Sequence, residues 1–301
     1  RGFITSLVIR EKDILKRLMI SEGEEFTIIN RKRNRNKNAV SIISKGILEL
    51  VQQDFKMLNF VRKFKPDFLL GTDIAITHIG KFFSIPSFVF NEDDYEINQL
   101  FCRVSYPFAK YIVAPDYTSV GKYSNKKISY NGIQKMAYLN KKYFVPEKTV
   151  LTELGLTYKD EFVIIRLVSL TAGHDIEGKH DGISIDVLDK IIYILEKKYK
   201  IFITSEDALP PKFAKFQVKI KLNQMHDLMH YASLFIGDSQ TMCAEAGILG
   251  TPFIRYNDFV GKIEYLNDLE RNYNLGWGIR TSESERLYKL LNDFVKMENT
   301  K

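Results

Sequence analysis

Cysteine and tryptophan are scarce in this sequence, which has two Cys and one Trp among 301 residues. Cys102 and Cys243 lie far apart and belong to no CxxC or Cys/His cluster, so a disulfide framework and a zinc site are not expected. No apolar run approaches the roughly 18 residues of a membrane-spanning helix, and no signal-peptide pattern opens the chain. These absences predict a protein of the reducing cytoplasm, with no metal and no cofactor.

The sequence also has no initiator Met. Arg1 and Gly2 read as the end of a helix that leads into a strand expected at 3–9. We therefore expect that an N-terminal βα unit is missing from this chain.

The charge balance is mildly basic, with 44 Lys and Arg against 37 Asp and Glu, a net charge of +7. Such an excess favours anionic partners, for example nucleotide phosphates or a membrane surface. Residues 31–37 carry five cations. This stretch is either a peripheral contact with anionic lipid or a phosphorylated acceptor, or a solvated loop. No aromatic residues alternate with its cations, so nucleic acid is not expected as a partner.

Short apolar runs alternate with longer amphipathic stretches along the whole chain, which predicts βαβ units and mainly parallel sheets. The expected strands are 3–9, 26–30, 68–71, 86–90, 111–114, 162–168, 200–204, 217–220, 233–237, 252–255 and 276–279. The rhythm breaks near 140–160. We therefore expect two Rossmann-like domains, 1–145 and 146–301, with a cleft between them.

One stretch, YASLFIGDSQTMCAEAGILGTP at 231–252, carries the strongest functional signal. A buried strand stops at Gly237, and a helix follows whose first turn includes Ser239, Gln240 and Thr241. The free N–H groups of that turn, together with the helix dipole, favour a phosphate. Glu245 stands four residues after Thr241 on the same helix face, where its carboxylate suits a ribose diol. The alternative is an ordinary capped helix with one exposed Glu.

Charged residues near other strand ends add candidates. Arg166 interrupts an apolar strand, and a buried Arg needs an anionic partner such as a diphosphate. His174, in a Gly-bounded loop, is suited to donate to a phosphate oxygen or to a leaving group, unless that loop is only a mobile surface segment. Arg255 ends another strand and is expected to close over the ligand.

In the first domain, Asp73 follows the strand at 68–71, where it serves as a helix N-cap or as an active-site acid. Four acids, including Glu96, fall within five residues after the strand at 86–90. Crowding of this kind raises carboxyl pKa values and suits a general acid or base. The structural alternative is that these acids only favour the N-terminus of the next helix.

The order Asp238, Ser239, Thr241, Glu245, Ala246, Gly250, Pro252 resembles the donor-nucleotide signature of GT-B enzymes. It is most similar to the non-hydrolysing UDP-N-acetylglucosamine 2-epimerases and to an uncharacterised GT-B-like family linked to surface polysaccharides. The resemblance implies a GT-B fold, in which the turn from Asp238 to Thr241 holds the diphosphate and Glu245 holds the ribose. It also implies catalytic roles for Asp73, Glu96 and His174.

Other segments carry the same resemblance. Residues 96–99, read as E-I-N-Q, resemble the epimerase E-x-N-R, with Gln99 in place of Arg. Residues 130–139 resemble the Y-x-G-x-x-E-x-A-Y-L of the uncharacterised family, with Lys135 in place of its Glu. The epimerase E-A-G-x-R after the strand is missing here.

We therefore expect a glycosyltransferase-like enzyme of surface-polysaccharide or glycan biosynthesis, which uses a nucleotide sugar such as a UDP-sugar and a glycan or lipid-linked acceptor. One alternative is a 2-epimerase acting on UDP-N-acetylglucosamine. The other is a non-catalytic module that binds a nucleotide sugar.

Overall fold

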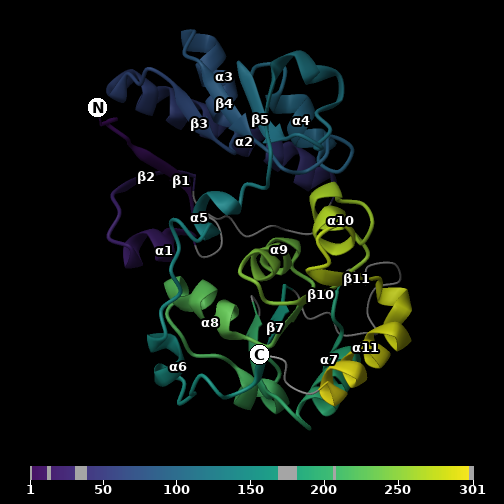
Figure 1. Ribbon diagram of the computed structural model, residues 1–301. Helices are drawn as coiled ribbons and strands as arrows, with labels where there is room; N and C mark the ends of the chain where they lie inside the picture. Colours follow the sequence, from purple (N-terminus) through teal and green to yellow (C-terminus); the bar gives the residue numbers. More distant parts are fainter. Residues whose placement is uncertain (1, 12–14, 31–38, 169–181, 206–207, 298–301) are drawn as a thin grey trace. The chain divides into compact units, whose positions relative to one another are not determined.

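The computed structural model describes residues 2–11, 15–30, 39–168, 182–205 and 208–297 (Figure 1). The chain divides into two compact units, Arg1–Gly132 and Ile133–Lys301. We expected residues 133–145 to end the first domain, yet they belong to the second unit. The reason is contact: the Tyr138 hydroxyl donates a hydrogen bond to Glu245 of the second unit.

The first unit alternates strands and helices along the chain. Its elements are β1 (Leu7–Arg10), α1 (Leu15–Ser21), β2 (Phe26–Asn30), α2 (Ala39–Phe64), β3 (Leu69–Gly71), α3 (Ile74–Phe83), β4 (Ser87–Phe90), α4 (Gln99–Ser105), β5 (Tyr111–Pro115), the 3-10 turn η1 (Gly121–Lys126) and β6 (Lys127–Tyr130). The strands form two parallel sheets, β1-β2 and β3-β4-β5-β6.

Apolar side chains from β2, α2, β3 and α3 form one core of this unit, with Ile29, Met57, Val61 and Ile76 among its buried members. His78 adds a polar link between three helices. Its Nδ1 lies 2.8 Å from Asp54 Oδ2 on α2, and its Nε2 lies 2.9 Å from the Val104 carbonyl oxygen on α4. Both ring nitrogens therefore face acceptors, which favours the imidazolium. The hydrogen bond to Asp54 raises the pKa of His78.

The second unit is built around a five-stranded parallel sheet. Its elements are α5 (Met136–Leu139), α6 (Thr149–Glu153), β7 (Phe162–Leu167), α7 (Ile185–Leu195), β8 (Lys200–Ser205), the 3-10 turns η2 (Pro211–Phe216) and η3 (Leu222–Gln224), α8 (Met225–Tyr231), β9 (Leu234–Gly237), α9 (Gln240–Ile248), β10 (Phe253–Tyr256), α10 (Glu264–Arg271), β11 (Gly276–Ile279), the 3-10 turn η4 (Thr281–Glu283) and α11 (Ser284–Lys296). The strand order is β8-β7-β9-β10-β11.

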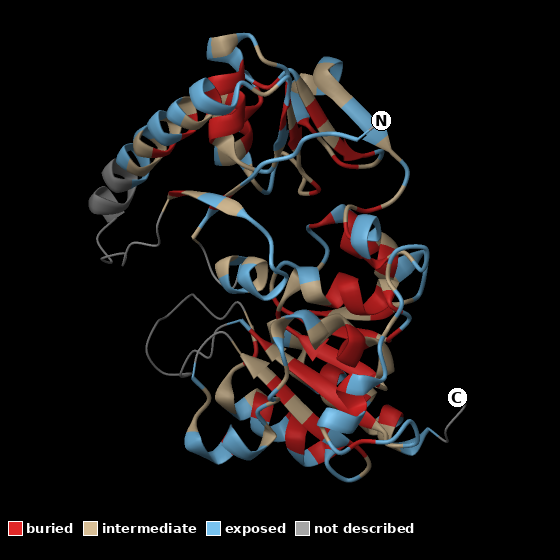
Figure 2. Cartoon of the chain, turned by 90° about the vertical axis from the view of Figure 1, so that its left-hand side faces the viewer, coloured by how far each residue is buried: buried red, intermediate tan, exposed pale blue. Residues whose placement is uncertain are grey.

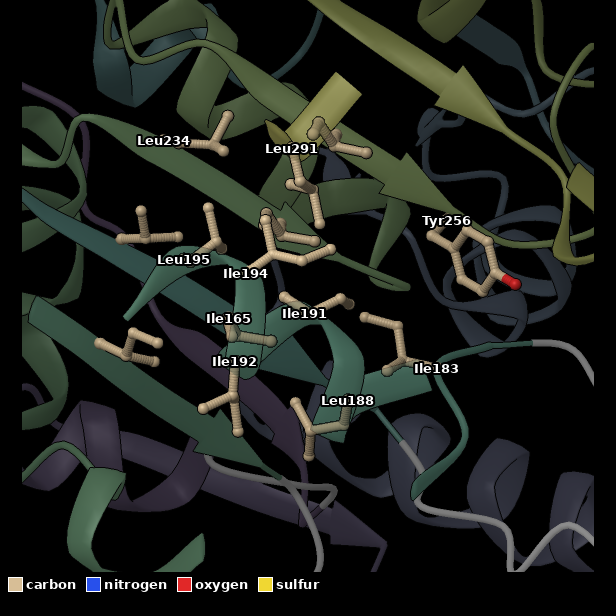
Figure 3. Close-up of a cluster of buried hydrophobic side chains, with 14 of the residues drawn as sticks. Ile165, Ile183, Leu188, Ile191, Ile192, Ile194, Leu195, Leu234, Tyr256 and Leu291 are labelled. Carbon is tan, nitrogen blue, oxygen red and sulfur yellow. The ribbon is translucent and has the colours of Figure 1, made fainter. Parts of the chain in front are cut away.

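The sheet of the second unit is buried on both faces, as the four consecutive apolar residues that begin β7 indicate. On one face, Ile165 and Ile236 pack against α7 and α11, with Leu188 and Leu291 among the helix side chains (Figure 3). Buried residues are concentrated in these strands and in the helix faces against them (Figure 2). On the other face, Phe253 lies against Gly247 of α9, and α9 contacts α8 and α10. This core fixes the carboxyl ends of the strands.

Most strands form where the apolar runs predict them, including β2 and β11 with the expected bounds. The strand expected at 217–220 is wrong. Gln217 makes only an isolated bridge to Ile203, after the 3-10 turn η2. The sequence pattern also missed β6, a four-residue strand at the edge of its sheet with mostly half-exposed and exposed residues.

The two cysteines are both fully buried, Cys102 in α4 of the first unit and Cys243 in α9 of the second. None of the described helices is long and apolar enough to cross a membrane.

Candidate functional site

The sheet of the second unit has a switch point between β7 and β9. Successive strands are added outward in opposite directions from there, with β8 on one side and β10 and β11 on the other. Arg166 near the end of β7 pairs in register with Gly237, the last residue of β9. Ligands of open α/β sheets bind beyond the carboxyl ends of the strands at such a point. The turn that follows Gly237 is therefore the expected place for a ligand.

Helix α9 begins in this turn. Ser239 is its N-cap, with an extended backbone, and its Oγ accepts a hydrogen bond from the Met242 N–H at 3.4 Å. Gln240 and Thr241 form the start of the helix, and Thr241 is exposed. The sequence predicted this cap. The first turn of α9 thus presents N–H groups and the positive end of the helix dipole at the switch point.

Asp238 is buried, and it fixes the backbone on both sides of residues 169–181. Its Oδ1 accepts from the Val168 N–H at 2.8 Å, and the Ile183 N–H also donates to its carboxylate. A Cβ at Gly182 would meet this carboxylate, so only glycine lets the chain pass so close. Burial raises the pKa of Asp238 from 3.8 to about 6. Asp238 therefore positions the backbone around the turn that leads into α9.

Asp238→Asn is expected to change how the stability of the second unit depends on pH. The folded state raises the pKa of Asp238, so the protonated carboxyl group stabilises the fold. This stabilisation is fully present below about pH 4 and is lost as the pH rises through about 6. The loss is on the order of 3 kcal/mol. Asparagine has no such titration. Urea unfolding, followed by Trp277 fluorescence between pH 4 and about 7, checks this.

In that experiment, the amide introduced at position 238 faces the Ile183 N–H and adds a destabilisation that does not vary with pH. The comparison between the two proteins is therefore of how steeply the free energy of unfolding changes with pH, and not of its absolute value. Parallel curves for the two proteins would show that Asp238 does not titrate in this range.

Glu245 lies one turn further along α9 and is 7% exposed. Its Oε1 accepts a 2.7 Å hydrogen bond from the Tyr138 hydroxyl, and its Oε2 lies 3.3 Å from His226 Nε2. Tyr138 comes from α5 and His226 from α8, both in the second unit. The carboxylate is therefore fixed in direction by two partners, and each oxygen retains capacity for a further donor. The sequence analysis predicted Glu245 but did not identify His226.

Arg166 is half-buried, and its Nη1 donates to Thr204 Oγ1 of the neighbouring strand at 3.1 Å. This hydrogen bond fixes the guanidinium near the carboxyl ends of β7 and β8. His174, the remaining residue predicted for this unit, lies outside the described residues.

The expected role of Arg255 is wrong. Its side chain is fully buried, so it does not close over a ligand. Instead, its Nε donates to Glu270 Oε1 of α10 at 2.7 Å. Gly237 and Gly278 flank Arg255 in the register of the sheet, and a Cβ at Gly278 would collide with Glu270. The pair belongs to the packing between the sheet and α10.

In the first unit, Asp73 follows β3 and is the N-cap of α3. Its Oδ1 accepts from the Ala75 N–H at 2.8 Å and also from the Gln53 amide. Arg10 Nη1 lies 3.6 Å from Oδ2. The capping role considered from the sequence is present, and these contacts hold the carboxylate at the carboxyl end of β3.

The acid-rich turn after β4 is tied to the turn after β5. The Ser119 N–H donates to Asp94 Oδ1 at 2.8 Å, and Ser119 Oγ donates to Glu96 Oε1 at 3.3 Å. Glu96 is exposed, whereas Glu92 is buried. Helix α4 begins only at Gln99. Glu96 therefore precedes the helix instead of standing in its first turn, and its carboxylate faces solvent at the carboxyl edge of the sheet.

Among the described residues, no group of three or more His, Cys, Asp and Glu side chains is arranged to hold a metal ion.

The parallel sheets and the α9 turn define an α/β protein of the GT-B type. A sequence profile described as "Protein of unknown function (DUF354)" matches residues 4–273, and the chain belongs to this family. No curated protein matches the sequence.

Several solved structures share the fold. The UDP-GlcNAc 2-epimerase of Neisseria meningitidis bound to UDP-GlcNAc matches with a TM-score of 0.60 at 15% identity, over 98% of this chain and 87% of that one. A 2-epimerase described as putative, from Listeria monocytogenes, gives 0.63 at 13% identity, over 98% and 80%. Arabidopsis thaliana UGT89C1 complexed with UDP gives 0.57 at 11% identity, over 96% and 83%. At these identities the similarity concerns the fold.

Proposed function

We propose that the second unit binds a nucleotide sugar, with UDP as the nucleotide, and that the protein is a glycosyltransferase-like enzyme of surface-polysaccharide or glycan assembly. One observation carries the proposal. The Ser239-capped start of α9 lies at the switch point of the sheet, and the oriented carboxylate of Glu245 lies one turn beyond it. A diphosphate suits the first feature and a ribose diol the second.

The roles of the other residues follow from charge and position. The diphosphate would lie against the N–H groups of Ser239, Gln240 and Thr241, with Arg166 as the nearby cation. Asp238 would hold the turn in place. A ribose hydroxyl would donate to Glu245 beside or instead of the Tyr138 hydroxyl. His174 stays a proposed donor to the diphosphate or leaving group.

The first unit would supply the general base, with Glu96 or Asp73 in that role. Glu96 is exposed and is held by one hydrogen bond from Ser119, so its carboxylate has capacity left for a substrate proton. Asp73 already accepts two hydrogen bonds and faces Arg10. These contacts favour Glu96 as the proposed base.

A 2-epimerase is the second candidate. The shared fold with UDP-GlcNAc 2-epimerases and the carboxylates after β3 and β4 support it. A third candidate, a binding module without catalysis, needs only the second unit's site. Incubation with UDP-N-acetylglucosamine, with and without an acceptor lipid, separates the three. Transfer releases UDP only with acceptor, epimerisation changes the sugar without acceptor, and a binding module does neither.

Glu245→Gln is expected to weaken UDP binding by about ten- to a hundredfold, the worth of a charge-assisted hydrogen bond. Pyrophosphate should lose much less affinity, because it has no ribose diol. Isothermal titration of the full chain with both ligands measures the difference.

Glu285→Gln, an exposed change on α11, is the matched control and should leave both affinities unchanged. Equal losses for UDP and pyrophosphate in the Glu245 variant would contradict the ribose role. Failure of the unchanged protein to bind UDP at all would contradict the nucleotide site itself.

A further inference from the structure

Three helix-to-strand connections of the first unit share one chemistry. The turns before β3, β4 and β5, taken to include the last turns of α2 and α3, each combine a lysine with a phenylalanine. The pairs are Lys63 with Phe64, Lys81 with Phe82, and Lys110 with Phe108. All three lysines are exposed, and the rings are 39%, 66% and 43% exposed in that order. Phe108 contacts the His78 ring and Phe82 contacts the Phe83 ring, yet each ring keeps a large exposed fraction beside an exposed lysine. We call these three turns the basic edge.

The sheet brings the three turns of the basic edge together. Strands β3, β4 and β5 are parallel neighbours, so their starts lie at one edge (Figure 1). The Leu69 N–H donates to the Pro86 carbonyl at 2.9 Å, and the Lys110 N–H donates to the Ser87 carbonyl at 3.2 Å. Lys126 of η1 donates to the Tyr106, Pro107 and Ala109 carbonyls beside these turns. Burial first, and then the like charges of Lys81 and Lys110, lower the pKa of Lys126, so these two lysines lie close enough to affect it.

The charge of the basic edge is almost entirely of one sign. Arg62 and Lys65 add exposed cations to the turn before β3, and Asp67 is the only acid in the three turns. Three exposed acids, Glu22, Glu24 and Glu25, precede β2, whose residues 27–29 line the groove described below. The turns before β3, β4 and β5 themselves carry a concentrated positive charge.

A groove adjoins this edge between β2 and α2. It has a volume of about 520 Å³, and Ile28, Phe60 and Phe64 give it apolar walls. Lys56 and Lys63 also line it. The Phe60 and Phe64 rings are stacked with their centroids 5.6 Å apart. Apolar walls with two ammonium groups suit a molecule that joins a hydrocarbon part to a phosphate.

We propose that the basic edge, with this groove, docks on an anionic phospholipid bilayer. The lysines would meet the phosphate head groups, and the exposed phenylalanine rings would enter the interfacial layer. A second copy of the chain fits poorly, because a symmetric contact would place these cations against themselves. Nucleic acid is less suited, because the groove beside the cations has apolar walls. The surface is independent of the nucleotide-sugar site, which lies in the other unit.

The test uses the full chain and vesicles of phosphatidylcholine, with or without about one-third phosphatidylglycerol, at about 0.15 M ionic strength. The unchanged protein should sediment with the anionic vesicles and not with the neutral ones. The triple variant Lys63→Gln, Lys81→Gln, Phe82→Ser should bind at least about 25-fold more weakly, since each cation near an anionic surface is worth about fivefold.

The matched control is Lys190→Gln, Tyr193→Ser, Lys197→Gln, on α7 and the turn that follows it. It also removes two cations and one exposed aromatic ring, and both lysines lie over the Tyr193 ring. Retained binding by this control supports the proposal. Three outcomes would overturn it: no binding to anionic vesicles, equal binding to neutral vesicles, or equal losses in the two variants. Tighter binding to a single-stranded oligonucleotide, lost in the first variant alone, would reassign the surface to nucleic acid.

Discussion

Replacing Glu96 with Gln is expected to lower turnover of a UDP-sugar by roughly 10²- to 10⁴-fold, the usual worth of a positioned general acid or base. UDP affinity should be nearly unchanged, because the nucleotide is proposed to bind in the second unit. The amide retains the shape of the side chain and can still accept the hydrogen bond from Ser119. The expected loss is therefore in the chemical step.

The alternative for Glu96 is purely structural. If this acid only favours the start of α4, its replacement should lower the free energy of unfolding by a few tenths to about 1 kcal/mol and leave turnover intact. The structure weakens this alternative, because α4 begins at Gln99 with Asn98 as its N-cap residue. Turnover and melting temperature, measured on the same protein, separate the two interpretations.

Asp116→Asn provides the matched control. Asp116 is an exposed acid directly after β5, at the same edge of the sheet. This variant should turn over normally. A Glu96 variant with normal turnover and a lower melting temperature would remove Glu96 from the mechanism and leave Asp73 as the proposed base.

Glu270→Gln is expected to lower the free energy of unfolding of the second unit by about 3–5 kcal/mol. Glu270 is the acid that faces the fully buried Arg255, at 2.7 Å. Among the described residues, Arg255 Nη1 and Nη2 have no hydrogen-bond partner. Arginine does not lose its proton in proteins, so the variant leaves a buried cation without its carboxylate. Urea unfolding measured by fluorescence reports this unit, since the single tryptophan, Trp277, lies in the adjacent β11.

Two further variants test whether the unpaired charge of Arg255 causes the destabilisation expected for Glu270→Gln. The double change Arg255→Met, Glu270→Leu removes both charges and should be less destabilised than Glu270→Gln alone. Asp189→Asn breaks the exposed ion pair with Lys212 and should cost no more than about 1 kcal/mol. If Glu270→Gln is as stable as Asp189→Asn, the buried pair does not contribute as its geometry suggests.

The sequence was a good guide wherever a local pattern determines the structure. The apolar run 162–168 predicts β7. The order of Ser239 and Glu245 after a buried strand predicts the N-cap of α9 and the place of Glu245 on that helix. These features depend on neighbours within a few residues, which a single sequence displays. The α/β fold followed because such units alternate along the whole chain.

Long-range partners were not predictable in the same way. Tyr138 is 107 residues before Glu245, and nothing near either residue indicates their hydrogen bond. Arg255 looked like a ligand contact because it ends a strand, but its partner Glu270 lies on a later helix. The alternating residues at 217–220 match a strand pattern, yet no continuous strand pairing forms there. Register and partner choice depend on tertiary packing that local periodicity does not encode.

The burial of one cysteine in each unit has a practical consequence. Burial raises the pKa of both Cys102 and Cys243, and a thiol reacts with alkylating reagents only as the exposed thiolate. Labelling of either thiol therefore requires local opening of the helix that carries it. Mass spectrometry of the two peptides after timed alkylation would give a separate opening rate for each unit, without any introduced probe.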